Sequence, residues 1–506
     1  MKEKKHFYFS LGLFLTSAFL IYPLFKYGIN PDAIAYISIA KKYFLMKWDI
    51  AINGNWGPLL SFLYIPSLLL GVEPVFYAKF FNIFLSILLF IQVKKLAISL
   101  SLPENYRITL FYSLIVPALY FTYWVISPDF ILLILFLIYV YHTISEEFLE
   151  TPGNAILVSA SGGLMFLAKS YGFPFFILHF MVFSIIKFLG IKKEKRKSML
   201  LNWSLAVLIF GIISGSWILA LNYKYDIWHF SSGNKAFFSQ IDPKNEMKHQ
   251  YLSRGIVEPP DSLAGSAHDD PSHYKLVEWS PFQTREDFVY YIGWVANNIF
   301  RLIIRFLSFT PLILLLLIPG VFAKWVRDKK VILLILSMLL YLSGYMLVFV
   351  EMRYLWQVFV PGMILAAKGV FFLFEKFTRI KKFENIALLF LILSFLPVSF
   401  SALAMRVNSG EKEFVIAQNI KAEFSPQDRI ASDTNWLETY YISYFAGFRY
   451  LGEEDKNLSD STFIEKLRTH NVAYIFQWRN KADGGLEEVA KNTKKEFRIY
   501  KLRDEQ

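Results

Sequence analysis

Asp32 and Tyr36 lie four residues apart in the stretch NPDAIAYISIAKK (residues 30–42), just after the first apolar segment. Four residues are about one helical turn, so a helix here presents both side chains on one face. A carboxylate beside a tyrosine hydroxyl could take the proton of an acceptor hydroxyl as a general base. An acid at a helix start is also an ordinary capping residue, and this second interpretation stays open.

Further acids stand near the ends of apolar segments. Asp129 follows a Ser-Pro pair at the start of one such segment, where an acid also suits the helix dipole. Glu351 precedes another segment and stands two residues before Arg353, with which it could simply pair. We expect Asp129, Glu351 and Tyr36 to position a donor or an acceptor.

Isolated cations occupy similar places in the sequence. They are Lys79, Lys169, Arg301, Arg305 and Arg353. Lysine and arginine side chains can stabilise the growing charge of a departing phosphate where water is scarce. The alternatives are snorkelling to the membrane surface and contact with lipid headgroups.

The segment SAHDDPSHYK (residues 266–275) gathers His268, Asp269, Asp270 and His273. These residue types could bind a divalent ion, but nothing in the spacing fixes the geometry, and an ordinary flexible loop is the alternative. The chain has no cysteine, which excludes a thiolate site. A divalent metal is therefore possible, and no other cofactor is expected.

Composition indicates that membrane helices must position these residues. The chain has 506 residues, of which 55% are hydrophobic and only 19% charged. We expect a mainly α, polytopic bundle of about eleven spans, since a span needs about 20 apolar residues. The expected spans are residues 7–25, 74–97, 107–126, 128–145, 154–169, 172–190, 199–222, 306–325, 330–350, 354–374 and 384–405. The shorter, proline-containing segment 57–71 is expected to be a partial or interfacial helix.

Basic clusters between the spans predict the orientation. With a cytoplasmic N-terminus, the inside loops hold most lysines and arginines, as the positive-inside rule requires. A first loop (26–73) with interfacial helices, a long loop (223–290) and the C-terminal region then lie outside. The net charge of +12 is explained by these clusters, so no nucleic-acid partner is expected. No phosphate-binding glycine fingerprint is present, which argues against a nucleotide cofactor.

The composition changes at residue 406, which divides a transmembrane catalytic region (1–405) from a domain of residues 406–506. Strand-like DRIAS, FRYLG, VAYIFQW and EFRIYKL alternate with helix-like segments that start near Asn435, Asp460 and Gly485. This alternation predicts a small extracytoplasmic α/β domain. Ser459 or Ser461 is the expected N-cap of its second helix.

A sugar carried on a lipid phosphate suits this combination of groups. One carboxylate would suffice to take the acceptor's proton, because a leaving phosphate with a second pKa of about 6 needs no proton. The spans would provide a groove for the lipid tail. The outer loops would form a pocket for the acceptor.

Several of these segments resemble motifs of a known family. PDAIAYISIAKK resembles the first outer loop of GT-C type membrane glycosyltransferases, the glycosyltransferase 39 relatives that include protein O-mannosyltransferases and the lipid A aminoarabinose transferase. NWGPLLSFL is similar to their Pro-rich segment, LLLGVEPVFYAKFFN to their glycine followed by a basic residue, and SPDFILLILFL to the acid that opens their fourth span. FLAKSYGFPF and EMRYL resemble their Lys-Gly and Arg-Tyr motifs. The likeness covers most of residues 1–220 and 291–375.

The resemblance implies an inverting, single-displacement transferase that uses a polyprenyl-phosphate sugar, with Asp32 in the position of the catalytic or acceptor-orienting acid. The chain departs from the family pattern at Ala33, at Gly57 and at residues 170–171 after Lys169. The sugar therefore stays open, as does the acceptor, which could be a hydroxyl, amine or phosphate group on a lipid, glycan or protein.

Two other functions remain as alternatives. One is an O-antigen ligase or polymerase that moves preassembled glycans, and the other is a lipid or glycan transporter or an envelope scaffold. A transporter usually places ionisable groups near the bilayer midplane, within corresponding halves of the chain. Here they gather at one expected membrane surface, which favours the transferase.

Overall fold

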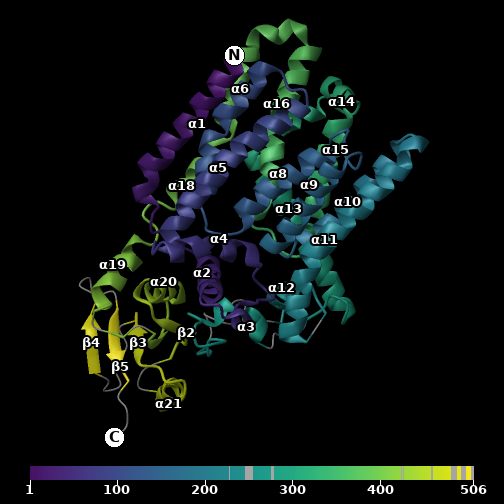
Figure 1. Ribbon diagram of the computed structural model, residues 1–506. Helices are drawn as coiled ribbons and strands as arrows, with labels where there is room; N and C mark the ends of the chain where they lie inside the picture. The colour runs from purple at the N-terminus through teal and green to yellow at the C-terminus, as the bar shows by residue number, and fades with distance from the viewer. Residues whose placement is uncertain are drawn as a thin grey trace.

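The computed structural model describes residues 1–226, 228–244, 255–274, 279–422, 424–425, 427–456, 460–479, 487–491 and 497–502. Helices form a long bundle, and a small sheet with its own helices lies beyond one end of it, near the C-terminus (Figure 1). The N-terminus lies at the other end of the bundle, at the start of α1 (Lys2–Ile21). The expectation of a mainly helical membrane protein with a small α/β region is confirmed.

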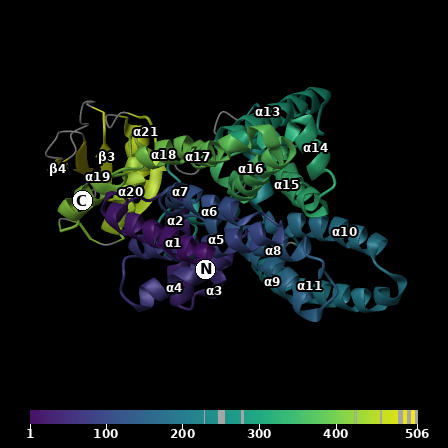
Figure 2. The same cartoon turned by 90° about the horizontal axis from the view of Figure 1, so that it is seen from above.

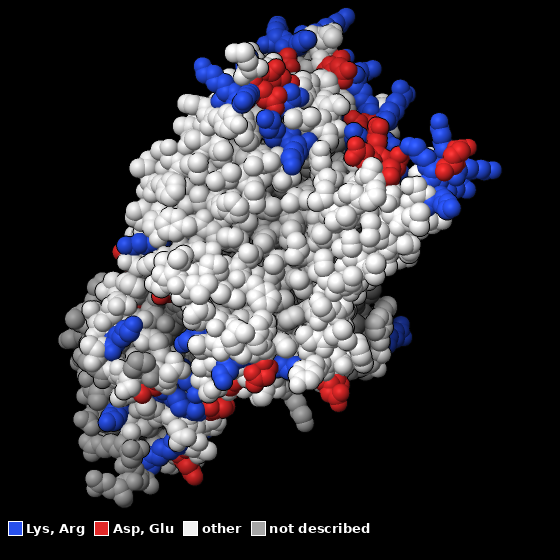
Figure 3. Space-filling view, viewed as in Figure 1, with Lys and Arg blue, Asp and Glu red and all other residues white. Residues whose placement is uncertain are grey.

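Eight helices of the described chain are long and apolar enough to cross a membrane. They are α1, α5 (Pro74–Ser99), α10 (Gly172–Gly190), α11 (Arg196–Tyr225), α13 (Arg285–Phe309), α15 (Lys329–Leu347), α16 (Trp356–Lys376) and the nearly continuous pair α17 (Glu384–Ser394) and α18 (Leu396–Ala404). Three shorter apolar helices accompany them: α4 (Pro58–Leu69), α8 (Asp129–Thr143) and α9 (Pro152–Ala168). Figure 3 shows a wide band with few charged side chains between two charged ends, which is the surface that lipid tails require.

Prolines shape two of the expected spans. Residues 107–126 form α6 (Glu104–Ser113) and α7 (Ile115–Tyr123), because Pro117 has no N–H to donate to the carbonyl of Ser113 and its ring crowds that carbonyl. Residues 306–325 form the end of α13, the 3₁₀ helix η5 (Pro311–Leu317) and α14 (Pro319–Trp325). The long helix of this region is α13, which begins well before the expected span.

Helix α16 runs through the centre of the bundle and is the most buried of the eight long helices. It contacts α8, α15 and α17, and Figure 2 shows it enclosed by its neighbours. The Trp356 ring packs 4.9 Å from the Phe121 ring, and Phe359 stacks on Phe309 at 4.2 Å. Since α16 directly follows the 3₁₀ helix η6 (Met352–Leu355), this packing also fixes the position of η6.

The basic turns lie at the end of the bundle that holds the N-terminus. They are η2 (Lys193–Lys195), the α14–α15 turn and η7 (Thr378–Phe383), and their side chains form the dense blue patches in Figure 3. The opposite end holds η1 (Tyr22–Leu24), α2 (Pro31–Phe44), α3 (Trp48–Ala51), α12 (Gly233–Ile241), η3 (Ala267–Asp269) and η4 (Pro271–His273). The small sheet lies at this second end (Figure 1).

The C-terminal region contains a five-stranded mixed sheet in the order β2-β1-β3-β5-β4. The strands β1 (Arg429–Ser432), β2 (Arg449–Glu453) and β3 (Tyr474–Gln477) are parallel, and β5 (Arg498–Lys501) pairs antiparallel with β3 and with β4 (Glu487–Lys491). The helices are α19 (Glu411–Ile420), α20 (Trp436–Ala446) and α21 (Ser461–Thr469). All four expected strands and the helices near Asn435 and Asp460 are present.

Two details of this region differ from the expectation. Gly485 lies outside the described residues, and the expected helix there is replaced, where the chain is described, by strand β4. The N-cap of α21 is Asp460, whose carboxylate accepts hydrogen bonds from the N–H groups of Thr462 and Phe463. Ser461 is therefore the first helical residue, and Ser459 lies outside the described residues.

Candidate active site

Asp32 occupies the second position of α2. Asn30 is the N-cap and Pro31 fixes the backbone at the first helical position, where its missing N–H costs nothing. The Asn30 side chain accepts a hydrogen bond from the backbone N–H of Ile126 (3.0 Å), which ties the helix start to the α7–α8 linker. Within the described chain, the ionic partners of the Asp32 carboxylate are side chains of other elements, Arg353 and His268.

Arg353, on η6, joins three carboxylates. Its Nη1 lies 2.5 Å from Asp32 Oδ2, and its Nε lies 2.7 Å from Glu351 Oε2 and 3.7 Å from Asp129 Oδ2. Burial acts to raise the pKa of Asp32, but the charge of Arg353 and the contact with His268 outweigh it and hold the pKa well below its usual value. Asp32 is therefore ionised at physiological pH.

A second ion pair lies behind this group. Lys169 Nζ is 2.7 Å from Asp129 Oδ1, and the Ser127 hydroxyl donates to Asp129 Oδ2 at 3.0 Å. The Lys169 ammonium also lies 3.5 Å from the centre of the Tyr354 ring, a cation–π contact. Asp129 is buried, and Gln357 of α16 donates to its backbone carbonyl (3.0 Å), so the start of α8 is locked to α16.

A cavity of about 350 Å³ opens beside Asp32. The start of α2, the α7–α8 linker, α13, η6 and the segment after α18 form its wall, and its charged residues are Asp32, Arg305, Glu351, Arg353 and Arg406. Arg305 donates a hydrogen bond to the Val350 carbonyl, and the Arg406 guanidinium lies 4.8 Å from the centre of the Trp124 ring. Guanidinium groups match phosphate oxygens in charge and geometry, so this cavity suits a phosphate group.

The other predicted phosphate ligands lie outside this cavity wall. Lys79 is buried in α5. Its Nζ lies beside Gly28, where an added Cβ would be 3.5 Å away. Lys169 is held by Asp129. Arg301 is exposed on α13, one turn from Arg305. Of the five predicted cations, the structure brings Arg305 and Arg353 to the wall.

Aromatic side chains cover the other side of Asp32. The Tyr36 ring lies 5.4 Å from the Trp56 ring, which lies 5.1 Å from the imidazole of His268. His268 Nε2 is 3.7 Å from Asp32 Oδ1, so the two carboxylate oxygens of Asp32 face different partners. Burial, together with the charges of Asp32 and Asp129, raises the pKa of Tyr36. The Tyr36 hydroxyl therefore stays protonated and can donate a hydrogen bond.

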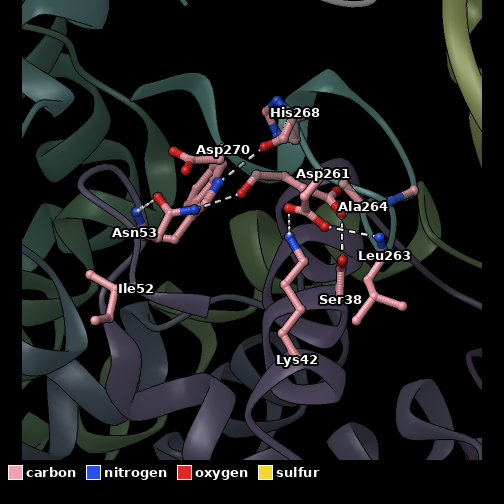
Figure 4. Close-up of polar contacts among 12 residues, drawn as sticks. Ser38, Lys42, Ile52, Asn53, Asp261, Leu263, Ala264, His268 and Asp270 are labelled. Atoms are coloured by element: carbon pink, nitrogen blue, oxygen red, sulfur yellow. Dashed lines mark hydrogen bonds and ion pairs between the residues drawn. The ribbon is translucent and has the colours of Figure 1, made fainter. Parts of the chain in front are cut away.

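Residues 255–274 form a bracket, a loop that carries His268 and is bonded to Ser38 and Lys42 of α2 (Figure 4). Lys42 Nζ lies 2.7 Å from Asp261 Oδ2, and the Ser38 hydroxyl donates to the Asp269 carboxylate. Asn53 donates to the Asp269 carbonyl (2.7 Å). Lys42 and Ser38 lie one turn apart on α2, so one face of this helix carries the bracket.

The same bracket is bonded to the C-terminal sheet. Gly255 and Val257 donate backbone hydrogen bonds to Glu453 and Leu451 of β2, and Tyr450 donates one to Gly265. The Arg449 guanidinium donates to the carbonyls of Asp261 (2.9 Å) and Ala264 (3.2 Å). The position of His268 therefore depends on the C-terminal region as well as on α2.

Comparison with solved structures identifies the arrangement of the helices. ArnT from Cupriavidus metallidurans bound to undecaprenyl phosphate matches over 97% of both chains, with a TM-score of 0.57 and 11% identity, and its apo state gives 0.56. The archaeal oligosaccharyltransferase AglB from Archaeoglobus fulgidus, in complex with an inhibitory peptide and a dolichol-phosphate, matches 93% of this chain and 69% of its own, with a TM-score of 0.50 and 10% identity. The chain has the GT-C fold.

Sequence comparisons add nothing to this result. No protein-family model matches the chain, and no curated protein matches it. The GT-C assignment therefore rests on three-dimensional arrangement, and it concerns the fold alone.

The four residues considered as metal ligands do not converge in the GT-C structure. His268 faces Asp32, and the Asp269 carboxylate accepts hydrogen bonds from Ser38 and from the Gly265 N–H. Asp270 lies 3.1 Å from Lys224 Nζ and 2.9 Å from the Tyr225 hydroxyl, while His273 is exposed. Among the described residues, no three His, Asp or Glu side chains lie close enough to hold a metal ion. These four residues therefore do not fit a divalent ion.

Arg406 is the cavity residue that reasoning from sequence missed. It follows the last span directly, at the end of the bundle opposite the basic turns. A lone arginine at the end of a span away from the basic turns runs against the positive-inside rule, and this exception was the available signal. The pairing of Lys42 with Asp261 had no such signal, because the two residues are 219 positions apart.

Proposed function

We propose that this protein is a glycosyltransferase that moves a sugar from a polyprenyl-phosphate donor to an acceptor on the outer face of the membrane, with inversion in a single displacement. One observation carries the proposal. Asp32 is paired with Arg353 at the wall of a cavity that also holds Arg305 and Arg406, at one end of a GT-C bundle. A carboxylate and a cluster of guanidinium groups are the two requirements of the reaction.

The arginines support a lipid-phosphate donor. The reaction breaks the bond between the sugar C1 and the phosphate oxygen, and the electron pair stays on that oxygen. Arg305, Arg353 and Arg406 would stabilise the added charge, and no acid is needed, because a phosphate monoester has a second pKa of about 6. The ArnT and AglB structures that resemble this chain hold undecaprenyl phosphate and dolichol-phosphate respectively, which agrees with this class of donor.

Asp32 supports attack by an acceptor. The acceptor forms its bond to C1 from the face opposite the phosphate, and the proton it loses needs a negative charge nearby. Asp32 supplies that charge, and Tyr36, one turn along α2, would orient the acceptor. Asp129 and Glu351 act less directly, because both hold cations of the site in place.

The proposed orientation places this site outside the cell. The basic turns at the N-terminal end would be cytoplasmic, as the positive-inside rule requires. Residues 26–73, 223–290 and 406–506 would then be extracytoplasmic. Residues 1–405 would form the catalytic membrane region and residues 406–506 a separate domain that supports acceptor binding.

The decisive experiment supplies purified protein with a panel of polyprenyl-phosphate sugars carrying labelled sugar groups. A transferase cleaves the sugar–phosphate bond, so label leaves the lipid, and Asp32→Asn abolishes the release. A transporter reconstituted in vesicles would instead move the intact donor across the bilayer. Movement of intact lipid without cleavage by any donor of the panel would contradict the proposal.

A further inference from the structure

His268 contacts the carboxylate oxygen of Asp32 that Arg353 does not hold. Its Nε2 lies 3.7 Å from Asp32 Oδ1, and this nitrogen is buried without a hydrogen-bond partner in the described chain. We propose that His268 is a further catalytic residue, which takes the proton of an acceptor hydroxyl while Asp32 balances the imidazolium charge. The inference rests on the proposed function and narrows its acceptor to a hydroxyl compound.

Asp32 alone is poorly suited to remove a hydroxyl proton. One of its oxygens is held by Arg353 at 2.5 Å, and this contact stabilises the carboxylate over the protonated acid. A stabilised carboxylate is a weak base. An imidazole beside a carboxylate is a better one, because the carboxylate orients the ring and stabilises its protonated form.

The surrounding structure fixes the main chain that carries the imidazole. The His268 N–H donates to the Ser266 hydroxyl (3.2 Å), and its carbonyl accepts a hydrogen bond from Trp56 Nε1 (3.0 Å). The Trp56 ring lies against the imidazole. Asp269, the next residue, is held by Ser38 of α2. These contacts hold the main chain on both sides of the imidazole.

The proposed step balances as follows. Nε2 carries the hydrogen that faces Asp32 Oδ1 at 3.7 Å, a charge–charge contact longer than a hydrogen bond, and the lone pair of Nδ1 is left for the acceptor hydroxyl. The hydroxyl oxygen forms its bond to the sugar C1, its proton moves to Nδ1, and the C1–O bond to the phosphate breaks with its electrons on oxygen. The imidazolium then returns its proton to water.

Charged and titratable groups face His268 from each element packed around it. Asp32 lies on α2, and Arg353 of η6 acts through Asp32. Asp269 belongs to the same loop, and Tyr440 of α20 interacts with both Asp269 and Asp32.

The test uses the full-length protein, a labelled polyprenyl-phosphate sugar that it cleaves, and two small acceptors, water and azide. Water must lose a proton, whereas azide has none to lose. In His268→Gln the amide nitrogen can keep the contact with Asp32 but cannot take a proton. We expect release to water to fall about 10²- to 10⁴-fold, with the donor KM and the reaction with azide unchanged.

His273→Gln, an exposed histidine of the same loop, is the matched control and should behave as the wild type. If His268→Gln fails to fold, His268→Ala with added imidazole provides the second test, and rescue of water release is expected. Wild-type release to water by His268→Gln, or equal losses with water and azide, would overturn the inference. The proposed function would still stand in that case, because it fails only if the wild-type protein cleaves no donor of the panel.

Discussion

Asp32 and Arg353 form an ion pair of 2.5 Å across 321 residues of chain. Both side chains are mostly shielded, with 19% and 15% of their surfaces exposed. The two carboxylate oxygens of Asp32 have different neighbours. Oδ2 contacts Arg353 of the arginine-lined cavity, and Oδ1 lies near His268, which is not part of the cavity wall. A lipid phosphate and an acceptor could therefore approach the same carboxylate from different directions.

Asp32→Asn tests this arrangement directly. Asparagine keeps the size of the side chain and its place in α2, and Arg353 keeps Glu351 as an ionic partner, so folding should persist. Loss of the negative charge should lower sugar transfer by about 10² to 10⁴. Asp49→Asn, an exposed acid in the first turn of α3, is the control. Single-turnover release of label measures the effect, and near-normal turnover would remove Asp32 from the mechanism.

Arg406→Gln should weaken donor use. If the guanidinium contacts the lipid phosphate, its loss should cost roughly 1.5–3 kcal/mol, or about tenfold to a hundredfold in donor KM, with apparent acceptor affinity unchanged. Lys421→Met removes an exposed cation at the end of α19 and should change neither value. Steady-state kinetics with each substrate varied separately give the answer. Equal losses for donor and acceptor would indicate a structural role for Arg406.

Asp129→Asn should destabilise the protein, because it leaves the Lys169 ammonium without its carboxylate partner. Removing one partner of a buried ion pair leaves an uncompensated charge, at a cost of about 3–5 kcal/mol. The double variant Asp129→Asn with Lys169→Met removes both charges and should recover most of this loss. Unfolding of the detergent-solubilised protein measures both values. A double variant no more stable than Asp129→Asn would argue against the pair as the cause.

Asp269 predicts a pH effect on stability. Burial raises its pKa in the folded protein despite the opposing charge of Lys42, so the folded state holds this proton more tightly than the unfolded chain. The protonated Asp269 therefore stabilises the folded protein fully at pH values below the pKa of the unfolded chain, which is about 4. This stabilisation is lost as the pH rises through the pKa of Asp269 in the folded protein. Asp269→Asn should flatten this part of the dependence of unfolding on pH, whereas Asp49→Asn should not. Parallel curves for the two variants would refute the prediction.

Cysteine labelling tests the proposed orientation in this cysteine-free chain. Cysteine at exposed Glu465 on α21 should react in intact cells with a maleimide that cannot cross membranes. Cysteine at exposed Glu194, in the turn between α10 and α11, should react only after lysis. The reverse pattern would place the candidate site in the cytoplasm.

Periodicity and proline explain what could be predicted from the sequence. Long apolar runs determine most helices, and alternating apolar residues determine the strands of the sheet. The break at Pro117 was predictable from its missing N–H. Strand β4 was not, because EEVAK favours a helix by local preference, and its pairing with β5 overrides that preference.

The candidate site likewise has features that the sequence predicts and features that it does not. Charge patterns suggested that Asp32 and Arg353 would share one membrane surface, but no pattern could assign partners. Lys169 was expected at the donor phosphate, whereas the structure pairs it with Asp129. Such pairings depend on helix packing, which brings together residues that no local rule connects.

The separation of the site residues along the chain also constrains how the protein is made. Asp32 is synthesised 321 residues before Arg353, and Arg406 emerges only after the last span. At typical synthesis rates of about 5–20 residues per second, Asp32 waits roughly 15–65 s at the membrane surface before its counter-ion exists. The cavity wall is incomplete during that interval, because Arg353 and Arg406 have not yet been made. If the proposed function holds, a nascent or truncated chain therefore cannot bind the donor lipid there, and the complete site forms only after the last span.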